Sequence, residues 1–290
     1  MKQLLILSGK GGTGKTTVAS AFIQLANAKA YADCDVDAPN LHLVIHHKNK
    51  ATTSDYFGLP KAEINPAICI QCDQCRSACR FDAISKSNQT GQYIVDPFSC
   101  EGCGVCELVC PVDAILLKPT IAGELMLFKN ESIFSTAQLK MGSGTSGKLV
   151  TEVKKQLKPD SEHVDLTIID GSPGIGCPVI ASLSGVDMVL IVAEPTISGI
   201  SDMERIIKTA STFRVKVAVC INKYDVNIKN TEKIMEYCHK HDIAYAGIIP
   251  YDPDAVKATN QGLSIAEFDC AAGRAVREVF EKTTDILSGV

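Results

Sequence analysis

The sequence predicts an α/β protein, built as a doubly wound, mostly parallel sheet with a small inserted domain. Short apolar segments alternate with amphipathic ones along most of the chain, as strands alternate with helices in such sheets. A separate stretch is crowded with cysteines instead and interrupts this alternation. Strands are expected at Gln3–Leu7, Val164–Ile169 and Val215–Ile221, with a further short strand ending in Tyr31–Asp37. Helices are expected at 17–28, 146–157, 199–212, 228–240 and 270–287.

The composition narrows the class of protein. The chain has 290 residues, of which 46% are hydrophobic, and its formal net charge is −4. This mild acidity disfavours electrostatic binding of nucleic acid. The early apolar run Leu4–Leu7 is far shorter than the roughly 20 residues of a membrane span, and it is too short for a secretory signal. We therefore expect a cytoplasmic protein that binds neither nucleic acid nor membrane.

Eight of the thirteen cysteines form two copies of one motif, C-x2-C-x2-C-x3-C, within a window of 42 residues. The first copy consists of Cys69, Cys72, Cys75 and Cys79, and the second of Cys100, Cys103, Cys106 and Cys110. The similarity continues beyond the cysteines, because Phe81-Asp82-Ala83-Ile84 corresponds to Val112-Asp113-Ala114-Ile115. The cysteine-rich window is therefore an internal repeat.

Metal binding explains this repeat better than disulfides, because the chain is too long and too poor in cysteine for a disulfide scaffold. Zinc is the competing metal, but its four ligands usually come as two separated pairs. Three closely spaced cysteines suit a [4Fe–4S] cluster whose fourth ligand comes from the other motif. The expected ligand sets are Cys69, Cys72, Cys75 and Cys110 for one cluster, and Cys100, Cys103, Cys106 and Cys79 for the other.

The window resembles the bacterial two-cluster ferredoxins over about fifty residues. Pro111 follows the second motif directly, as in those proteins. Arg80 follows the first motif, where a proline usually stands. This departure alters the turn after the motif and removes no ligand.

A glycine-rich loop lies between the first expected strand and the first expected helix. It reads Gly9-Lys10-Gly11-Gly12-Thr13-Gly14-Lys15-Thr16-Thr17 and contains the P-loop pattern G-x-x-x-x-G-K-T. Glycines let backbone N–H groups converge on phosphate oxygens, and the helix N-terminus adds partial positive charge. Lys15 is expected to contact the β- and γ-phosphates, and Thr16 to coordinate Mg²⁺. The alternative is a glycine-rich turn that binds no nucleotide.

The second lysine of the loop, Lys10, points to one family. Lys-Gly-Gly-x-Gly-Lys-Thr-Thr resembles the deviant Walker A motif of the MinD/ParA-type ATPases and of the nitrogenase iron protein. In that family the early lysine reaches the phosphates of the partner subunit. The resemblance therefore implies a homodimer that forms on ATP binding, with Lys10 and Lys15 both acting at the phosphates.

Four acidic residues fit the same resemblance. Asp35 stands where the family has the aspartate that orients the attacking water, and Asp33 and Asp37 are supporting acids or merely solvated. Asp170 ends an apolar strand just before Gly171-Ser172-Pro173-Gly174. It resembles the acid that holds Mg²⁺ through a water molecule.

Two segments resemble the part of the family that binds the base. Asn222 opens Asn222-Lys223-Tyr224-Asp225 and is implied to bond the adenine edge, although this pattern also occurs in GTPases. Pro250 lies in the segment 249–253, which resembles the loop that flanks the base. The alternative for the second segment is a plain proline-rich turn.

A second glycine-rich segment, 142–148, also matches the P-loop pattern, but Leu149 follows it in place of a hydroxyl residue. It resembles the stretch of the nitrogenase iron protein that carries one ligand of a bridging cluster, with Thr145 at the cysteine position. Cys177, seven residues after Asp170, stands at the position of the other bridging ligand. Because one of the two ligands is lost, we expect no bridging cluster and a buried thiol at Cys177, with a redox or metal role as the alternative.

The expected organisation is an ATPase domain in two pieces, 1–59 and 119–290, with the ferredoxin-like insert at 60–118. The leading hypothesis is a dimeric Mg-ATPase that couples its nucleotide state to electron transfer through two [4Fe–4S] clusters. Its partner would be an unidentified redox or iron–sulfur protein. The alternatives are an iron–sulfur assembly or delivery factor, and a regulatory or positioning ATPase with structural or oxygen-sensing clusters.

Overall fold

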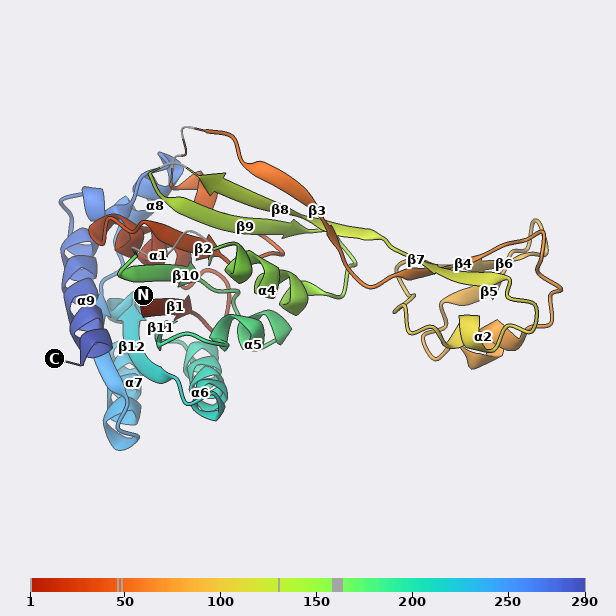
Figure 1. Ribbon diagram of the computed structural model, residues 1–290. Helices are drawn as coiled ribbons and strands as arrows, with labels where there is room; N and C mark the ends of the chain where they lie inside the picture. Colours follow the sequence, from red (N-terminus) through yellow and green to blue (C-terminus); the bar gives the residue numbers. More distant parts are fainter. Residues whose placement is uncertain (1, 46, 48, 130, 158–163, 290) are drawn as a thin grey trace. The chain divides into compact units, whose positions relative to one another are not determined.

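The computed structural model describes residues 2–45, 47, 49–129, 131–157 and 164–289. The chain folds into two compact units (Figure 1). The larger unit comprises Met1–Thr53, Leu125–Gln138 and Ser146–Val290, and the smaller unit comprises Ser54–Glu124 and Leu139–Thr145. The smaller unit contains both cysteine motifs, and it extends beyond the 60–118 segment expected from the sequence.

Within the described residues, nine strands form one sheet in the order β13-β12-β11-β1-β10-β2-β9-β8-β3, most of it in the larger unit (Figure 1). The six pairings from β13 to β9 are all parallel. The strands are β1 (Lys2–Leu7), β2 (Ala30–Asp33), β3 (Thr52–Phe57), β8 (Ile121–Lys129), β9 (Ile133–Leu139), β10 (Leu166–Asp170), β11 (Met188–Ala193), β12 (Lys216–Asn222) and β13 (Ala244–Ile249). The predicted α/β class with a mostly parallel sheet is confirmed.

Helices cover both faces of this sheet, which is why its central strands are apolar throughout. The helices are α1 (Lys15–Leu25), α4 (Ser146–Gln156), α5 (Cys177–Leu183), α6 (Ile197–Thr212), α7 (Ile228–Lys240), α8 (Pro253–Asn260) and α9 (Ala271–Ser288). Short 3-10 turns occur at Leu41–Leu43, Tyr224–Val226 and Ile265–Glu267. On one face, Leu4 and Ile6 share a core with Phe22 of α1 and Val276 of α9. The rings of Phe22 and Phe280 meet edge to face at 5.1 Å, and so fix α9 against α1.

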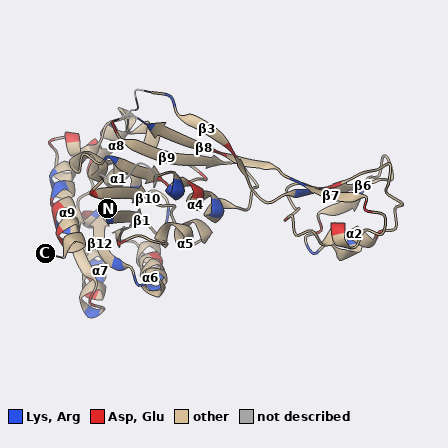
Figure 2. Ribbon diagram, viewed as in Figure 1, with Lys and Arg blue, Asp and Glu red and all other residues tan. Residues whose placement is uncertain are grey.

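The last helix, α9, packs against this core. Its buried positions include Ala272, Val276 and Val279, which face the apolar core of the larger unit. Basic and acidic residues both occur along its ribbon (Figure 2). In the described part of the chain no helix combines the length and the apolar character needed to cross a bilayer.

The strands β3, β8 and β9 lie beyond β2 and were not expected from the sequence. The residues of β3, Thr-Thr-Ser-Asp-Tyr-Phe, are mostly exposed, because this strand lies at the edge of the sheet. In β8 most side chains are only partly buried. The strand β3 therefore lacks the continuous apolar run that marks the central strands of a parallel sheet, whereas β8 has a short one at 125–128, preceded by Gly123 and Glu124.

The smaller unit consists of two short antiparallel pairs and two short helices. The strands β4 (Lys61–Ile64) and β7 (Ile115–Lys118) pair with each other, as do β5 (Ile84–Lys86) and β6 (Tyr93–Val95). The helices α2 (Gln74–Ala78) and α3 (Val105–Leu108) each begin inside a cysteine motif. Its core contains Cys75, Cys100 and Cys106 beside Ile84 and Ile115.

The backbone of the smaller unit repeats as its sequence does. A left-handed conformation recurs at three matching pairs of positions, which Gly, Asp and Asn tolerate better than other residues. The pairs are Gln71 and Gly102 (φ 57° and 62°), Asp73 and Gly104 (67° and 78°), and Asp82 and Asp113 (50° and 50°). The two cysteine motifs therefore adopt the same loop conformation.

The segment 139–145, which precedes α4, packs inside the smaller unit. The Tyr56 hydroxyl donates a hydrogen bond to the Thr145 carbonyl at 3.3 Å. A Cβ atom on Gly142 would lie 2.7 Å from the Phe98 ring, so this position has no room for a side chain. Sequence patterns did not reveal this association, because these contacts join residues more than forty positions apart.

Candidate functional site

The P-loop has the strand–loop–helix context that phosphate binding requires. The strand β1 ends at Leu7, and α1 begins at Lys15 with Gly14 as its N-terminal cap. Gly14 has φ 90°, and a Cβ atom there would lie 2.3 Å from Asn222 Nδ2. Only glycine fits this position, because it meets both a left-handed backbone and a close neighbour. A cavity of about 400 Å³ is lined by the loop from Lys10 to Thr17.

Gly9 stands apart from the other predicted loop residues, because it does not line this cavity. A Cβ atom on Gly9 would lie 2.1 Å from Asp202 Cβ on α6. The absence of a side chain at Gly9 therefore lets the loop approach α6. The structure does not place Gly9 in contact with the phosphate cavity.

Lys15, Thr16 and Asp170 converge at the base of the P-loop. Lys15 Nζ lies 2.5 Å from Asp170 Oδ1, and the Thr16 hydroxyl donates to Asp170 Oδ2 at 2.8 Å. Burial alone would lower the pKa of Lys15, but the Asp170 carboxylate outweighs burial and leaves that pKa raised. The site therefore places a charged ammonium, a hydroxyl and a carboxylate where phosphate and Mg²⁺ are expected to bind.

The structure separates the three acids that follow β2. Asp35 lines the cavity beside the P-loop, whereas Asp33 is fully buried behind it. Asp33 accepts hydrogen bonds from the backbone N–H groups of Asp35, Asn40 and Leu41 at 2.9–3.0 Å. Asp37 is exposed. Asp33 therefore shapes the loop, and Asp35 is the acid that faces the site.

Burial gives both inner acids unusual titration behaviour. It raises the pKa of Asp33 to about 7, and the negative charge of Asp170 adds to this effect. Burial also raises the pKa of Asp35 to about 6, although the Lys15 ammonium opposes the shift. Asp35 thus changes its charge close to neutral pH, in the range where a general base works well.

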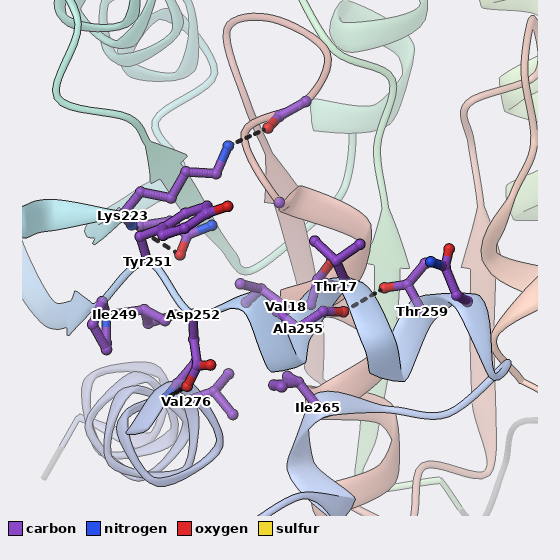
Figure 3. Close-up of a pocket in the computed structure, with 17 residues that line it drawn as sticks. Thr17, Val18, Lys223, Ile249, Tyr251, Asp252, Ala255, Thr259, Ile265 and Val276 are labelled. Atoms are coloured by element: carbon purple, nitrogen blue, oxygen red, sulfur yellow. Dashed lines mark hydrogen bonds between the residues drawn. The ribbon is translucent and has the colours of Figure 1, made fainter. Parts of the chain in front are cut away.

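Asn222, the last residue of β12, and Lys223, which follows it, hold the backbone of the P-loop. Asn222 Nδ2 donates to the Thr13 carbonyl at 2.7 Å, and its Oδ1 accepts from the Lys223 N–H at 3.0 Å. Lys223 Nζ donates to the Gly12 carbonyl at 2.8 Å (Figure 3). Asn222 also lines the neighbouring cavity. The side chain that was expected to bond adenine is therefore already engaged with the P-loop in this structure.

A second cavity of about 260 Å³ adjoins the P-loop and is mostly apolar. Figure 3 shows Ile249, Ala255, Ile265 and Val276 around it, with Lys223 and Tyr251 together at one side. Pro250 lines the same cavity, as do Thr17 and Thr259, which also line the phosphate cavity. An apolar cavity next to a P-loop has the character of a site for a planar base.

Asp225, the last residue of the Asn-Lys-x-Asp pattern, is not among the residues that line this cavity. Its Oδ1 accepts a hydrogen bond from the Tyr251 backbone N–H at 2.7 Å. This carboxylate thus fixes the loop after β13 through one of its two oxygens.

Lys10 is held within its own chain. Its Nζ lies 2.8 Å from Glu194 Oε2 and donates to the Thr196 hydroxyl at 3.2 Å. Glu194 Oε1 lies 3.1 Å from Lys223 Nζ. Burial opposes ionisation of Glu194, but the two lysines outweigh it and lower its pKa. Sequence reasoning missed Glu194 and Lys223 as partners, although each directly follows an apolar strand, where site residues of parallel sheets gather.

In the smaller unit, one cavity is lined by Cys69, Cys72, Cys75 and Cys110 together with Tyr93. The fourth cysteine of the second motif thus faces the first three of the first motif. The Cys110 thiol accepts a hydrogen bond from the Ala114 N–H at 3.2 Å. All thirteen cysteines lie within the described residues, and none of them forms a disulfide.

Three of the remaining motif cysteines, Cys100, Cys103 and Cys106, lie close to one another. Burial raises the pKa of Cys106, and its neighbours Cys100 and Cys103 add to this effect. Cys79, which ends α2, packs against the same apolar core as Cys100 and Cys106. The structure thus gathers the members of the first expected ligand set around one cavity, and the assignment of Cys79 to the second set stays a prediction.

Cys177 differs from the expectation of a buried thiol. It is exposed at the first position of α5, so that expectation is wrong. A Cβ atom on Gly147 would lie 3.0 Å from the Cys177 carbonyl oxygen, which explains why a glycine allows α4 to approach this turn. Cys34, Cys220, Cys238 and Cys270 are buried, as expected for cysteines that pack as small apolar residues.

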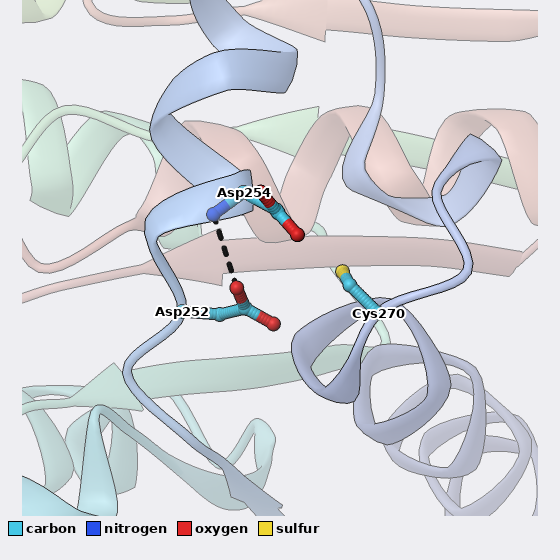
Figure 4. Close-up of side chains that lie close together, drawn as sticks. All are labelled: Asp252, Asp254 and Cys270. Carbon is cyan, nitrogen blue, oxygen red and sulfur yellow. Dashed lines mark hydrogen bonds between the residues drawn. The ribbon is translucent and has the colours of Figure 1, made fainter.

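Asp252, Asp254 and Cys270 also offer ligand atoms within 4.8 Å of one another (Figure 4). Asp252 accepts from the N–H groups of Asp254 and Ala272, at 3.0 and 3.1 Å. Cys270 accepts from the Gly273 N–H at 3.3 Å. These backbone hydrogen bonds, led by the one from Ala272, lower the pKa of Asp252. The group is therefore explained by capping of the N-termini of α8 and α9.

Comparisons with known proteins bear on the nucleotide site and on the cysteine motifs. An uncharacterized protein of Methanocaldococcus jannaschii is 32% identical over 290 residues, covering 98% of this chain and 97% of the relative. An uncharacterized ferredoxin of the same organism is 38% identical over 64 residues, which cover 21% of this chain and 41% of that protein. An iron–sulfur cluster carrier protein of Pyrococcus furiosus is 23% identical, covering 99% of this chain and 87% of the carrier.

Among solved structures, the septum site-determining protein MinD of Pyrococcus horikoshii, complexed with Mg-ADP, matches with a TM-score of 0.58. The match is 19% identical and covers 99% of this chain and 97% of that chain, so it supports the fold. The model of the CobQ/CobB/MinD/ParA nucleotide binding domain matches residues 4–265, which include the P-loop, Asp170 and Asn222. The chain therefore belongs to the CobQ/CobB/MinD/ParA family of P-loop nucleotide-binding proteins, to which the MinD- and ParA-type ATPases belong.

Proposed function

We propose that this protein is an ATP-dependent dimeric ATPase whose smaller unit carries two [4Fe–4S] clusters and passes electrons to a partner protein under control of the nucleotide. The cavity lined by Cys69, Cys72, Cys75 and Cys110 is the observation that carries the iron–sulfur half of the proposal. Four thiols around one cavity are the donor set that a [4Fe–4S] cluster takes, and a zinc site would more often use paired motifs. When bound, such clusters supply one-electron redox chemistry.

Hydrolysis would use the residues at the base of the P-loop. The Lys15 ammonium would leave Asp170 for the phosphate oxygens, and Thr16 and Asp170 would then hold Mg²⁺. Asp35, which faces the same cavity, would orient a water molecule for in-line attack on the γ-phosphate. Lys10 of the partner subunit would stabilise the charge that develops there.

Two connections along the chain support coupling between nucleotide and clusters. The chain runs from the loop that contains Asp35 through 36–53 into the smaller unit, so this stretch would carry a change in the loop toward the cysteine motifs. The segment 139–145 of the smaller unit continues into α4, whose Gly147 abuts Cys177 in the turn after Asp170. Order and movement of such loops around a γ-phosphate is a known type of switch.

An anaerobic redox titration followed by EPR, with and without Mg-ATP, tests this proposal. We expect the cluster potentials or the rate of electron release to shift with Mg-ATP in the wild type and to stay constant in Lys15→Ala. Lys155→Ala is the matched control, because this lysine is exposed on α4 and pairs only locally with Glu152. Identical potentials and rates with and without Mg-ATP in the wild type would rule out nucleotide control.

The iron–sulfur carrier relative favours one second candidate, in which the protein delivers a cluster to other proteins. The buried cysteines argue against it, because Cys75, Cys100 and Cys106 belong to the apolar core of the smaller unit. A cluster held by core residues is costly to release. Incubation with an apo-ferredoxin decides between the two: transfer of iron and sulfide within minutes supports delivery, and retention supports electron transfer.

A further inference from the structure

Glu194 occupies a position from which one carboxylate reaches two lysines. In the sheet order, β11 lies between β12 and β1, and all three strands run parallel. Glu194 directly follows β11, so it stands between the P-loop after β1 and Lys223 after β12. The register pairs Leu7 with Ile191 and Ile221 with Ala193, which brings the three strand ends to one level.

Each oxygen of Glu194 holds a different lysine. Oε2 pairs with Lys10 at 2.8 Å and Oε1 with Lys223 at 3.1 Å. The side chain of Glu194 is 16% exposed, against 34% for Lys10 and 28% for Lys223. Water therefore screens the carboxylate less than it screens a surface pair, and both contacts are charge-assisted hydrogen bonds.

Lys10 also has hydroxyl partners on the same segment. It donates to Thr196 Oγ1 at 3.2 Å and to Ser198 Oγ at 3.5 Å, so its ammonium is surrounded by three oxygens of its own chain. Thr196 is the N-terminal cap of α6 and accepts from the Gly199 N–H. The hydroxyl groups that accept hydrogen bonds from Lys10 thus lie at the N-terminus of α6. They stay in place when the side chain of Lys10 moves away.

We propose that Glu194 is a positioning residue that holds Lys10 within its own subunit and thereby sets the ATP concentration at which two subunits associate. This inference rests on the proposed function, in which Lys10 reaches the phosphates of the partner subunit. Lys10 must leave Glu194 to do so. Lys223 stays on Glu194 and on the Gly12 carbonyl, and it keeps the carboxylate paired when Lys10 has gone.

Glu194→Gln is the informative variant, because it keeps the size of the side chain and removes the charge. Glu232→Gln is the matched control, since Glu232 is exposed on α7 and loses the same charge. The first measurement is acetylation of lysines in the nucleotide-free protein, followed by mass spectrometry. We expect Lys10 to react slowly in the wild type and in Glu232→Gln, and several-fold faster in Glu194→Gln. Equal rates in all three proteins would overturn the contact with Glu194.

The second measurement is the fraction of dimer during a Mg-ATPγS titration, by analytical ultracentrifugation. We expect the midpoint for Glu194→Gln to lie roughly threefold to tenfold below that of the wild type, as for loss of a partly buried ion pair. The affinity of each monomer for a fluorescent ATP analogue is measured separately, so that an effect through Lys223 and Gly12 is not mistaken for easier association.

The outcomes separate the two levels of the proposal. Faster acetylation of Lys10 with an unchanged midpoint overturns the regulatory role of Glu194 and leaves the dimer intact. Failure of the wild type itself to dimerise overturns the proposed function, while the acetylation result still shows whether Glu194 holds Lys10. Faster acetylation with a lowered midpoint supports both.

Discussion

Lys15 Nζ lies 2.5 Å from Asp170 Oδ1, and both side chains are buried in the larger unit. The second oxygen of Asp170 accepts from the Thr16 hydroxyl at 2.8 Å. One carboxylate therefore organises both groups that are expected to meet Mg-ATP. Binding of the substrate must exchange the Lys15–Asp170 pair for contacts of Lys15 with phosphate and of Asp170 with the metal.

This exchange predicts a specific effect of Asp170→Asn. Because the neutral amide is a weaker Mg²⁺ ligand than the carboxylate and does not hold Lys15 by charge, Mg²⁺ should raise the affinity of this variant for ATP much less than that of the wild type. ATP hydrolysis should fall roughly hundredfold or more. Fluorescent ATP binding with Mg²⁺ or EDTA, together with phosphate release, measures both effects. Lys15→Ala should instead lose affinity in both conditions. If Mg²⁺ raised the affinity of Asp170→Asn for ATP as much as it raises that of the wild type, this prediction would be contradicted.

The hydrogen bond from the Tyr251 N–H to Asp225 predicts a preference for ATP over GTP. A carboxylate that reads guanine must accept hydrogen bonds from that base, but Asp225 is used by the backbone of the loop after β13. Asp225→Ala should therefore weaken binding of ATP and GTP by the same factor, because it loosens the loop that lines the base cavity. Competition binding with both nucleotides measures the ratio. A selective loss of GTP binding would show that Asp225 reads the base.

The raised pKa of Asp35 predicts the pH dependence of hydrolysis. With a pKa of about 6, this carboxyl is protonated at lower pH and cannot orient the attacking water. We expect kcat/KM for ATP to rise as the pH increases through about 6 and then to level off. Residual hydrolysis by Asp35→Asn should lack this rise. Affinity for a fluorescent ATP analogue over the same range is the control, and a flat wild-type kcat/KM profile would contradict the prediction.

The sequence predicted those parts of the larger unit that depend on local patterns. The P-loop, the apolar central strands and Asp170 at a strand end follow from residue types at fixed spacing. The roles of Asp33 and Asp35 could not be separated in this way, because both are acids after one strand. Only packing shows that Asp33 is turned inward to three backbone N–H groups.

Contacts between distant segments escaped the sequence for the same reason. Glu194 and Lys10 lie 184 positions apart, and only the strand order β12-β11-β1 brings them together. Cys177 was expected to be buried because free cysteines usually pack in the protein interior as small apolar side chains. It is exposed at the first position of α5, beside Gly147 of α4.

The cavity that joins Cys110 to the first cysteine motif leads to the last prediction. If ligands cross between the motifs, each cluster depends on one distant cysteine. In Cys110→Ser the protein should lose about half of its roughly eight irons. The thiols set free should be those of Cys69, Cys72 and Cys75.

Anaerobic alkylation of the native Cys110→Ser protein, followed by peptide mass spectrometry, tests this assignment. We expect iodoacetamide to modify Cys69, Cys72 and Cys75 in this variant while Cys100, Cys103 and Cys106 remain protected, and Cys79→Ser should give the reverse pattern. Cys238→Ser is the matched control, because Cys238 is buried on α7 far along the chain from both motifs and should not change the iron content. Exposure of Cys100, Cys103 and Cys106 in Cys110→Ser would show instead that each motif holds its own cluster.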